Sequence, residues 1–150
     1  MRSGCAAFGA LRFSAVAGAT FRLVGRTWLY RPMLKDKALA SLAAGDLLLE
    51  RGFTDDAASR YYYAMFQAAV HALTRQGWTP GRLQSGALEW GHVVVLNNVS
   101  LVRGRRSDRA LFDSMRDLRV KADYRDDSIA PGLLAARVDD VRAFVEEVTA

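Results

Sequence analysis

The sequence predicts an all-α protein, an antiparallel bundle of four to five helices. Apolar side chains recur at steps of three and four in several segments, and short polar or glycine-containing turns separate these segments. No two segments show the period-two alternation expected of paired strands. A chain of 150 residues that is 51% hydrophobic is long enough to form one domain with its own core. We therefore expect one helical domain over residues 33–150.

The first two expected helices form a pair joined by a short turn. Residues 36–51 place apolar side chains at helical spacing and are followed by Gly52, a residue that commonly ends a helix. Thr54 is the expected N-cap of the second helix, with two aspartates in the first turn, where the helix dipole favours acids. The second helix continues with apolar residues spaced by threes and fours until Gly77 and the turn at residues 79–81.

A third helix is expected within residues 83–102. The valine run at residues 93–95 would suit a strand if taken alone. Because no partner strand is found elsewhere in the sequence, we expect this segment to be helical.

The fourth and fifth helices have the clearest periodicity. Ser107 and Asp108 are the expected cap of the fourth helix, which ends near Tyr124, and Pro131 suits the first turn of the fifth. Their apolar residues step by threes and fours: Leu111, Met115, Leu118 and Ala122 in the fourth helix, and Leu134, Val138, Val141, Val145 and Val148 in the fifth.

The net charge of +5 comes from the N-terminal segment. Residues 1–35 contain six basic and no acidic residues, whereas the rest of the chain contains 15 basic and 16 acidic residues. The whole-chain charge is therefore no argument for a general nucleic-acid-binding surface. We expect residues 1–32 to be either a disordered extension or a stretch upstream of a true start at Met33. A transit peptide is a further alternative, because the segment has no acid and its arginines are spaced along it. A secretory signal is less expected, because Arg12 interrupts the apolar run that such a signal needs.

Several classes of protein are excluded by what the sequence lacks. The single cysteine, Cys5, cannot form an internal disulfide, and His71 and His92 have no metal-ligand spacing, so we expect no metal and no cofactor. The common hydrolase, metalloprotease and nucleotide-binding motifs are missing. The uncharged stretches of residues 1–32 are too short to span a bilayer, and we expect a cytoplasmic protein without membrane contact.

Five polar residues on helices that otherwise look like core are the candidate binding site: Arg60, His92, Arg119, Asp123 and Tyr124. The spacing of four puts Arg119 and Asp123 on one helix face, where an ion pair would leave other guanidinium donors for a phosphate.

Each candidate also has a structural interpretation. The Arg119 pair could be a simple salt bridge, Arg60 could cover apolar surface, and His92 could be either an acid–base group or a buried hydrogen-bonding residue. The neighbouring aromatic residues, 61–63 and Phe66, are expected to be core. The arginines of residues 103–106 form a basic turn, expected to be solvated, that could otherwise contact RNA or an acidic partner.

Three segments match a known family pattern. Residues 57–66, AASRYYYAMF, look like A-x-S-R-x-Y-Y-A-M-F; His92 opens an H-x-x-V helix; and residues 119–124, RVKADY, are similar to R-x-x-A-D-Y. In these motifs residues 38–148 resemble the HEPN domain, named for nucleotide binding in higher eukaryotes and prokaryotes, and in particular its small stand-alone prokaryotic subfamily.

The resemblance implies an antiparallel helical bundle that commonly dimerises and often works beside a minimal nucleotidyltransferase in a toxin–antitoxin pair. Ribonuclease members use an arginine followed four to six residues later by a histidine, and this sequence has no histidine after His92. Some family toxins are silenced by nucleotide transfer to a tyrosine near that motif, which makes Tyr124 a candidate modification acceptor.

The function expected from the sequence is therefore a homodimeric binding module rather than an enzyme. It would engage a nucleotide, RNA or a nucleotidyltransferase partner through the five candidate residues. One alternative is a divergent metal-independent ribonuclease in which His92 and Arg119 are catalytic. A second alternative is a purely structural helical adaptor.

Overall fold

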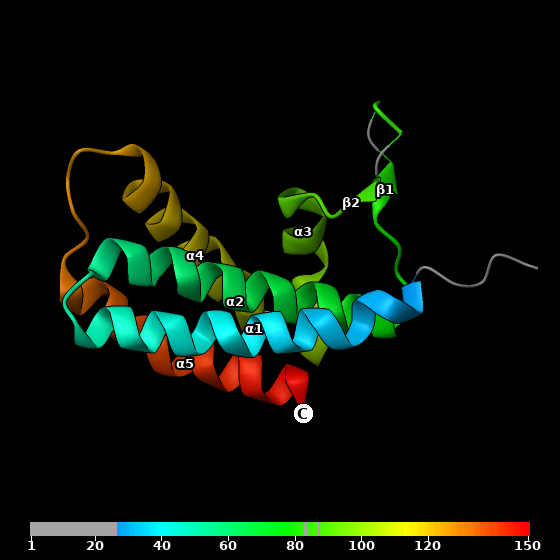
Figure 1. Cartoon of the computed structure of the whole chain (residues 1–150), viewed down its shortest axis with the longest axis horizontal. Coiled ribbons are helices and arrows are strands. Elements are labelled where there is room, and N and C mark those ends of the chain that lie inside the picture. The colour runs from blue at the N-terminus through cyan, green and yellow to red at the C-terminus, as the bar shows by residue number, and fades with distance from the viewer. Residues whose placement is uncertain (1–26, 83, 87) are drawn as a thin grey trace, which may run out of the picture.

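The computed structural model describes residues 27–82, 84–86 and 88–150, and this part of the chain is an all-α bundle with one small hairpin (Figure 1). The elements follow in the order α1 (Thr27–Glu50), α2 (Thr54–Arg75), β1 (Gly81–Arg82), β2 (Leu88–Glu89), α3 (His92–Arg103), α4 (Ser107–Tyr124) and α5 (Pro131–Thr149). The predicted fold class is confirmed.

Helix α2 is the centre of the bundle. It packs against α1, α3, α4 and α5, and Figure 1 shows α1 alongside it with α5 below. The core around α2 contains large side chains that are fully buried, including Tyr61, Met65, Phe112 and Phe144. Gly45 of α1 allows the ring of Tyr61 to approach closely, because a Cβ there would lie 3.0 Å from two ring carbons.

The burial predicted for the apolar positions is confirmed fully in α5 and only in part in α4. All five apolar positions predicted in α5 are buried. In α4, Met115 is buried as expected, but Leu111, Leu118 and Ala122 are only partly buried. The fully buried residue beside them is Phe112, which was not among the predicted positions.

Helix α1 begins before the predicted position. It starts at Thr27 rather than near residue 36, so it continues across the boundary expected between residues 32 and 33. Residues 1–26, which make up most of the predicted extension, lie outside the described residues.

Two predicted caps are wrong in detail. Thr54 is the first residue of α2, Phe53 occupies the cap position, and no side chain there bonds to the helix end. The Asp55 carboxylate instead accepts a hydrogen bond of 2.8 Å from the backbone N–H of Ile129. At α4 the cap position belongs to Arg106, again without a side-chain hydrogen bond, while the Asp108 carboxylate binds Arg103. Each aspartate is used in a contact between segments rather than in a local cap.

The third helix is shorter than predicted. Only the part from His92 onward is helical, and the two short strands that precede it form an antiparallel hairpin that projects from the bundle (Figure 1). Gly86 in the hairpin loop has a φ of 82°, a conformation that glycine adopts without strain. The valine run at residues 93–95 is helical, as expected. None of the described helices is both long enough and apolar enough to cross a membrane.

Candidate functional site

One face of α2 carries four residues that point toward α3 and α4. Ser59, Tyr62, Tyr63 and Phe66 follow the spacing i, i+3, i+4, i+7, which places side chains on a single side of a helix. Each of them contacts a residue of α3 or α4 through a hydrogen bond or a ring contact. This face therefore brings the predicted site residues of two other helices together.

His92 begins α3 and is held by two aromatic residues of α2. The Tyr62 hydroxyl and the imidazole Nδ1 lie 2.7 Å apart in a hydrogen bond, and the two rings stack with centroids 5.7 Å apart. The ring of Phe66 lies 4.6 Å from the imidazole on centroids. Because these contacts use Nδ1 and the ring faces, Nε2 is the nitrogen left to meet a ligand.

The surroundings keep the imidazole of His92 neutral. Partial burial lowers its pKa, and the positive charges of Arg119 and Arg116 lower it further, against a smaller opposing effect of Glu89. Burial also raises the pKa of Tyr62 to about 12, so this hydroxyl keeps its proton near neutral pH. The site thus contains a neutral imidazole next to two guanidinium groups.

Arg119 lies between two tyrosine rings. Its guanidinium carbon is 5.5 Å from the ring centroid of Tyr63 and 5.6 Å from that of Tyr124, distances typical of cation–π contacts. Its Nη2 donates a hydrogen bond of 3.2 Å to the Tyr63 hydroxyl. Within the described part of the chain, no residue accepts a hydrogen bond from Nη1. The guanidinium is therefore fixed in position and keeps donors for a ligand.

The predicted pair of Arg119 and Asp123 forms. Arg119 Nε lies 2.6 Å from Asp123 Oδ2, an electrostatic contact in which Nε has no hydrogen-bond partner among the described residues. The Ser59 hydroxyl donates a hydrogen bond of 2.6 Å to the other oxygen of the same carboxylate. Ser59 thus orients Asp123, and Asp123 orients Arg119.

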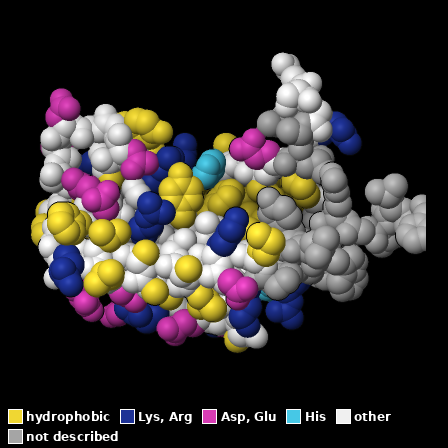
Figure 2. All heavy atoms as spheres, in the orientation of Figure 1, with side chains coloured by type: hydrophobic (Ala, Val, Ile, Leu, Met, Phe, Trp, Pro, Cys, Tyr) yellow, Lys and Arg dark blue, Asp and Glu magenta, His cyan; other side chains and the backbone are white. Residues whose placement is uncertain are grey.

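The candidate set is only partly brought together. His92 and Arg119 share one face, because their partners Tyr62 and Tyr63 are adjacent, with ring centroids 5.8 Å apart. Arg60 is exposed on α2, and across the described ranges no hydrogen bond, ion pair or ring contact joins it to the other candidates. Figure 2 shows this side of the molecule hollowed beside the projecting hairpin, with histidine, hydrophobic and basic side chains gathered at the hollow.

Sequence reasoning missed the residues of α2 that hold the site. Tyr62, Tyr63 and Phe66 were expected to be core, and Tyr62 is indeed buried, but all three also position His92 or Arg119. Ser59 and Arg116 were not candidates. The i, i+3, i+4, i+7 pattern beginning at Ser59 was the available signal, since it mixes a hydroxyl with aromatic residues on one face.

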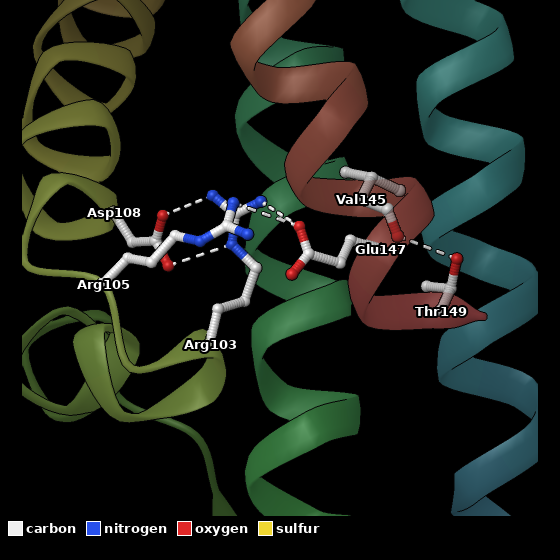
Figure 3. A network of polar contacts seen from close by, with 6 residues as sticks. All are labelled: Arg103, Arg105, Asp108, Val145, Glu147 and Thr149. Carbon is white, nitrogen blue, oxygen red and sulfur yellow. Dashed lines mark hydrogen bonds and ion pairs between the residues drawn. The ribbon is translucent and has the colours of Figure 1, made fainter.

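The basic turn at residues 103–106 agrees with its prediction in part: Arg105 and Arg106 are exposed, as expected, and Arg103 is not. The Arg103 side chain is only 9% exposed, and it pairs with Asp108 of α4 and, at 2.9 Å, with Glu147 of α5 (Figure 3). Arg105 also reaches Glu147, at 3.2 Å. Arg103 therefore links three helices and is not available as a free surface cation. Among the residues that the structure describes, no cluster of three or more His, Cys, Asp or Glu side chains could hold a metal ion.

Comparison with known families agrees with this fold. The family model of the HEPN domain matches residues 32–149, which is most of the chain. The chain belongs to the HEPN domain family. The resemblance seen in the sequence is thereby confirmed at the level of the family, and the match begins six residues before the predicted one. No curated protein is similar enough to this chain to count as a match.

HEPN domains are generally associated with nucleotides or RNA, and they often dimerise. In this HEPN domain the groups suited to a nucleotide are the guanidinium of Arg119, the imidazole of His92 and the exposed ring of Tyr124. A guanidinium with fixed orientation suits a phosphate, because its planar donors match two phosphate oxygens. An exposed aromatic ring suits a base, because every base has a face that stacks.

Proposed function

We propose that this HEPN domain is a binding module that holds a phosphate of a nucleotide or of single-stranded RNA at Arg119. The observation that carries the proposal is the placement of the Arg119 guanidinium between two tyrosine rings, oriented by Asp123, with Nη1 not engaged by any described residue. Such a cation is ready to bind an anion with little loss of side-chain freedom.

The neighbouring groups support a nucleotide rather than a simple anion. Tyr124 is 72% exposed, so its ring offers a stacking surface next to the cation. His92 Nε2 is able to donate or accept one hydrogen bond to a sugar hydroxyl or phosphate oxygen. Arg60, being exposed and apart from these contacts, has at most a peripheral part in binding.

Binding without cleavage fits the protonation states of the site. Metal-independent RNA cleavage needs a base for the 2′-hydroxyl and an acid for the leaving oxygen. His92, neutral at pH 7, could serve as the base. Tyr62, whose pKa burial raises to about 12, is a poor proton donor to the leaving oxygen. Of the hydrogen-bonded pair of His92 and Tyr62, only the imidazole is therefore suited to proton transfer near pH 7.

The divergent ribonuclease remains the second candidate, because His92 and Arg119 lie on one face rather than on opposite surfaces. Incubation of the purified chain with labelled single-stranded RNA decides between the two candidates. Cleavage that His92→Gln abolishes would establish the enzyme. Intact RNA that binds the wild type supports the binding module.

Binding is tested with a fluorescent single-stranded RNA hexamer and with adenosine monophosphate. Arg119→Ala is expected to weaken the Kd for the RNA roughly tenfold to a hundredfold, as for loss of a charge-assisted hydrogen bond worth about 1.5–3 kcal/mol. Arg109→Ala is the matched control, because it removes the same charge from α4, roughly 15 Å away along the helix axis. Equal losses in the two variants, or none in either, would contradict the proposal and favour the structural adaptor.

The partners expected from the family belong to the same proposal. The module would act as a homodimer in a toxin–antitoxin-like pair with a minimal nucleotidyltransferase, and Tyr124, with its exposed ring beside Arg119, would accept the nucleotide. In that reaction the Tyr124 hydroxyl attacks the α-phosphate of a nucleoside triphosphate, loses its proton and displaces pyrophosphate. Co-expression with such a nucleotidyltransferase should therefore raise the intact mass by one nucleoside monophosphate less one water. The added mass should disappear in Tyr124→Phe. Its persistence in that variant would exclude Tyr124 as the acceptor.

A further inference from the structure

A pocket lies away from the Arg119 site, where α2, α3 and α5 end. It has a volume of about 380 Å³ and is lined by four polar or charged residues, Arg75, Gln76, Arg103 and Glu147, and by three apolar ones, Ala72, Val102 and Val148. Arg103, at the end of α3, also lines it, whereas His92 begins the same helix about 16 Å away along its axis. The two sites are therefore separate, and a volume of this size is within the range of small-molecule pockets.

The cation in this pocket is rigid. The side chain of Arg103 is almost fully buried, pairs with the buried carboxylate of Asp108, and has its guanidinium carbon 4.9 Å from the ring centroid of Phe144. Moving two charges out of water is costly, and an apolar replacement of such a pair is often equally stable. Fold stability alone is thus a weak reason for this arrangement, whereas a fixed guanidinium at the wall of a pocket is suited to binding an anion.

An internal carboxylate already occupies the anion position. Glu147 Oε2 lies 2.9 Å from Arg103 Nη1 and 3.2 Å from Arg105 Nη1, so that one oxygen sits between two guanidinium groups (Figure 3). The side chains of Glu147 and Arg105 are 47% and 55% exposed, and a pair at that exposure contributes little stability, while Arg103 keeps its pair with Asp108 when Glu147 leaves. The Glu147 side chain is therefore able to swing out at little cost.

We propose that this pocket binds a small carboxylate with a short hydrocarbon body. The ligand carboxylate takes the place of the Glu147 side chain between Arg103 and Arg105, and its hydrocarbon body packs on Ala72, Val102 and Val148. Arg75, which also lines the pocket, adds a further positive charge. These arginines offset the negative ends of the three helices that meet here, which would otherwise disfavour an anion.

The test is an NMR titration of the full chain with hexanoate, using hexanol as the uncharged probe of the same length. Hexanoate is expected to shift the amide signals of Ala72, Val102 and Val148, and hexanol is not. Glu147→Gln removes the charge of the competing side chain and should tighten hexanoate binding severalfold. Arg105→Ala should weaken it. Glu146→Gln, the neighbouring acid on α5, is the matched control and should leave the affinity unchanged.

Three results would overturn the proposal. The first is an absence of shifts up to about 10 mM hexanoate, a concentration that would nearly saturate a site with a Kd of about 1 mM. The second is equal hexanoate affinity in Glu147→Gln and the wild type, and the third is binding of hexanol as tight as that of hexanoate. Both substituted residues that test the site, Glu147 and Arg105, are substantially exposed, so the variants are expected to fold. Arg119→Ala should not change hexanoate binding, which keeps this proposal distinct from the phosphate site.

Discussion

Two arginine–aspartate pairs in this HEPN domain have the same chemistry and different surroundings. In the pair of Arg103 with Asp108 the two side chains are 9% and 1% exposed, and in the pair of Arg119 with Asp123 they are 19% and 30% exposed. The first joins α3 to α4 and extends to α5, whereas the second lies within α4 and faces α2. Burial thus makes the first pair a link between helices, and partial exposure lets the second present a cation to a ligand.

The largest effect on stability is expected from breaking the buried pair. Asp108→Ala leaves the Arg103 charge buried beside Glu147 alone, and the free energy of unfolding should fall by about 3–5 kcal/mol. Asp123→Ala, the same change in the exposed pair, should cost about 1 kcal/mol or less. Urea denaturation of both variants measures the difference. Equal losses would show that burial does not distinguish the two pairs.

An intermediate effect is expected from Ser59, which belongs to the exposed pair. Ser59→Ala removes the hydrogen bond that orients Asp123, and should lower stability by about 1 kcal/mol and weaken RNA binding severalfold. Ser41→Ala is the matched control, because its hydroxyl donates a comparable hydrogen bond of 3.0 Å to Gln67 away from the site. Its cost in stability should be similar and its RNA affinity unchanged. A loss of RNA affinity in Ser41→Ala as well would assign the effect to general destabilisation.

The same contrast explains what the sequence could predict. The local pair of Arg119 and Asp123, four residues apart on one helix, follows from helix geometry and was found. Glu147 was missed as a partner of Arg103, because it lies 44 residues away and only the packing of α5 brings it near. Ser59 and Tyr63 were missed as site residues for the same reason, since their partners are on α4.

The helices show a similar division. Apolar periodicity, together with the residues at the helix ends, predicted the bounds of α2, α4 and α5 well. Helices α2 and α5 bury one face along most of their length, whereas α4 does so only in its first half. The hairpin has strands of only two residues, too short for any alternation to be visible. The second strand was therefore assigned to the third helix, which in fact begins at His92, and Gly81 of the first strand was assigned to a turn.

The smallest effect is expected in the pH dependence of stability. Burial and the charges of Arg119 and Arg116 hold the pKa of His92 below its usual value, so the unfolded chain binds a proton here more readily than the folded one. The contribution of His92 to the free energy of unfolding is therefore full at a pH above about 6.5, the pKa of histidine in the unfolded chain. It is lost as the pH falls from there toward the lower pKa that His92 has in the folded chain. His92→Gln should show a shallower fall of unfolding free energy below pH 6.5 than the wild type. An identical slope would contradict the direction of the pKa shift.

The most direct test of the phosphate site is to measure the pKa of His92 by NMR with and without the RNA hexamer. An RNA phosphodiester keeps its negative charge throughout this pH range, so a phosphate bound at Arg119 should favour the charged imidazole and raise the pKa of His92. The rise should disappear in Arg119→Ala and persist in Arg109→Ala. A pKa of His92 that stays unchanged while the wild type is saturated with RNA would show that the phosphate binds elsewhere.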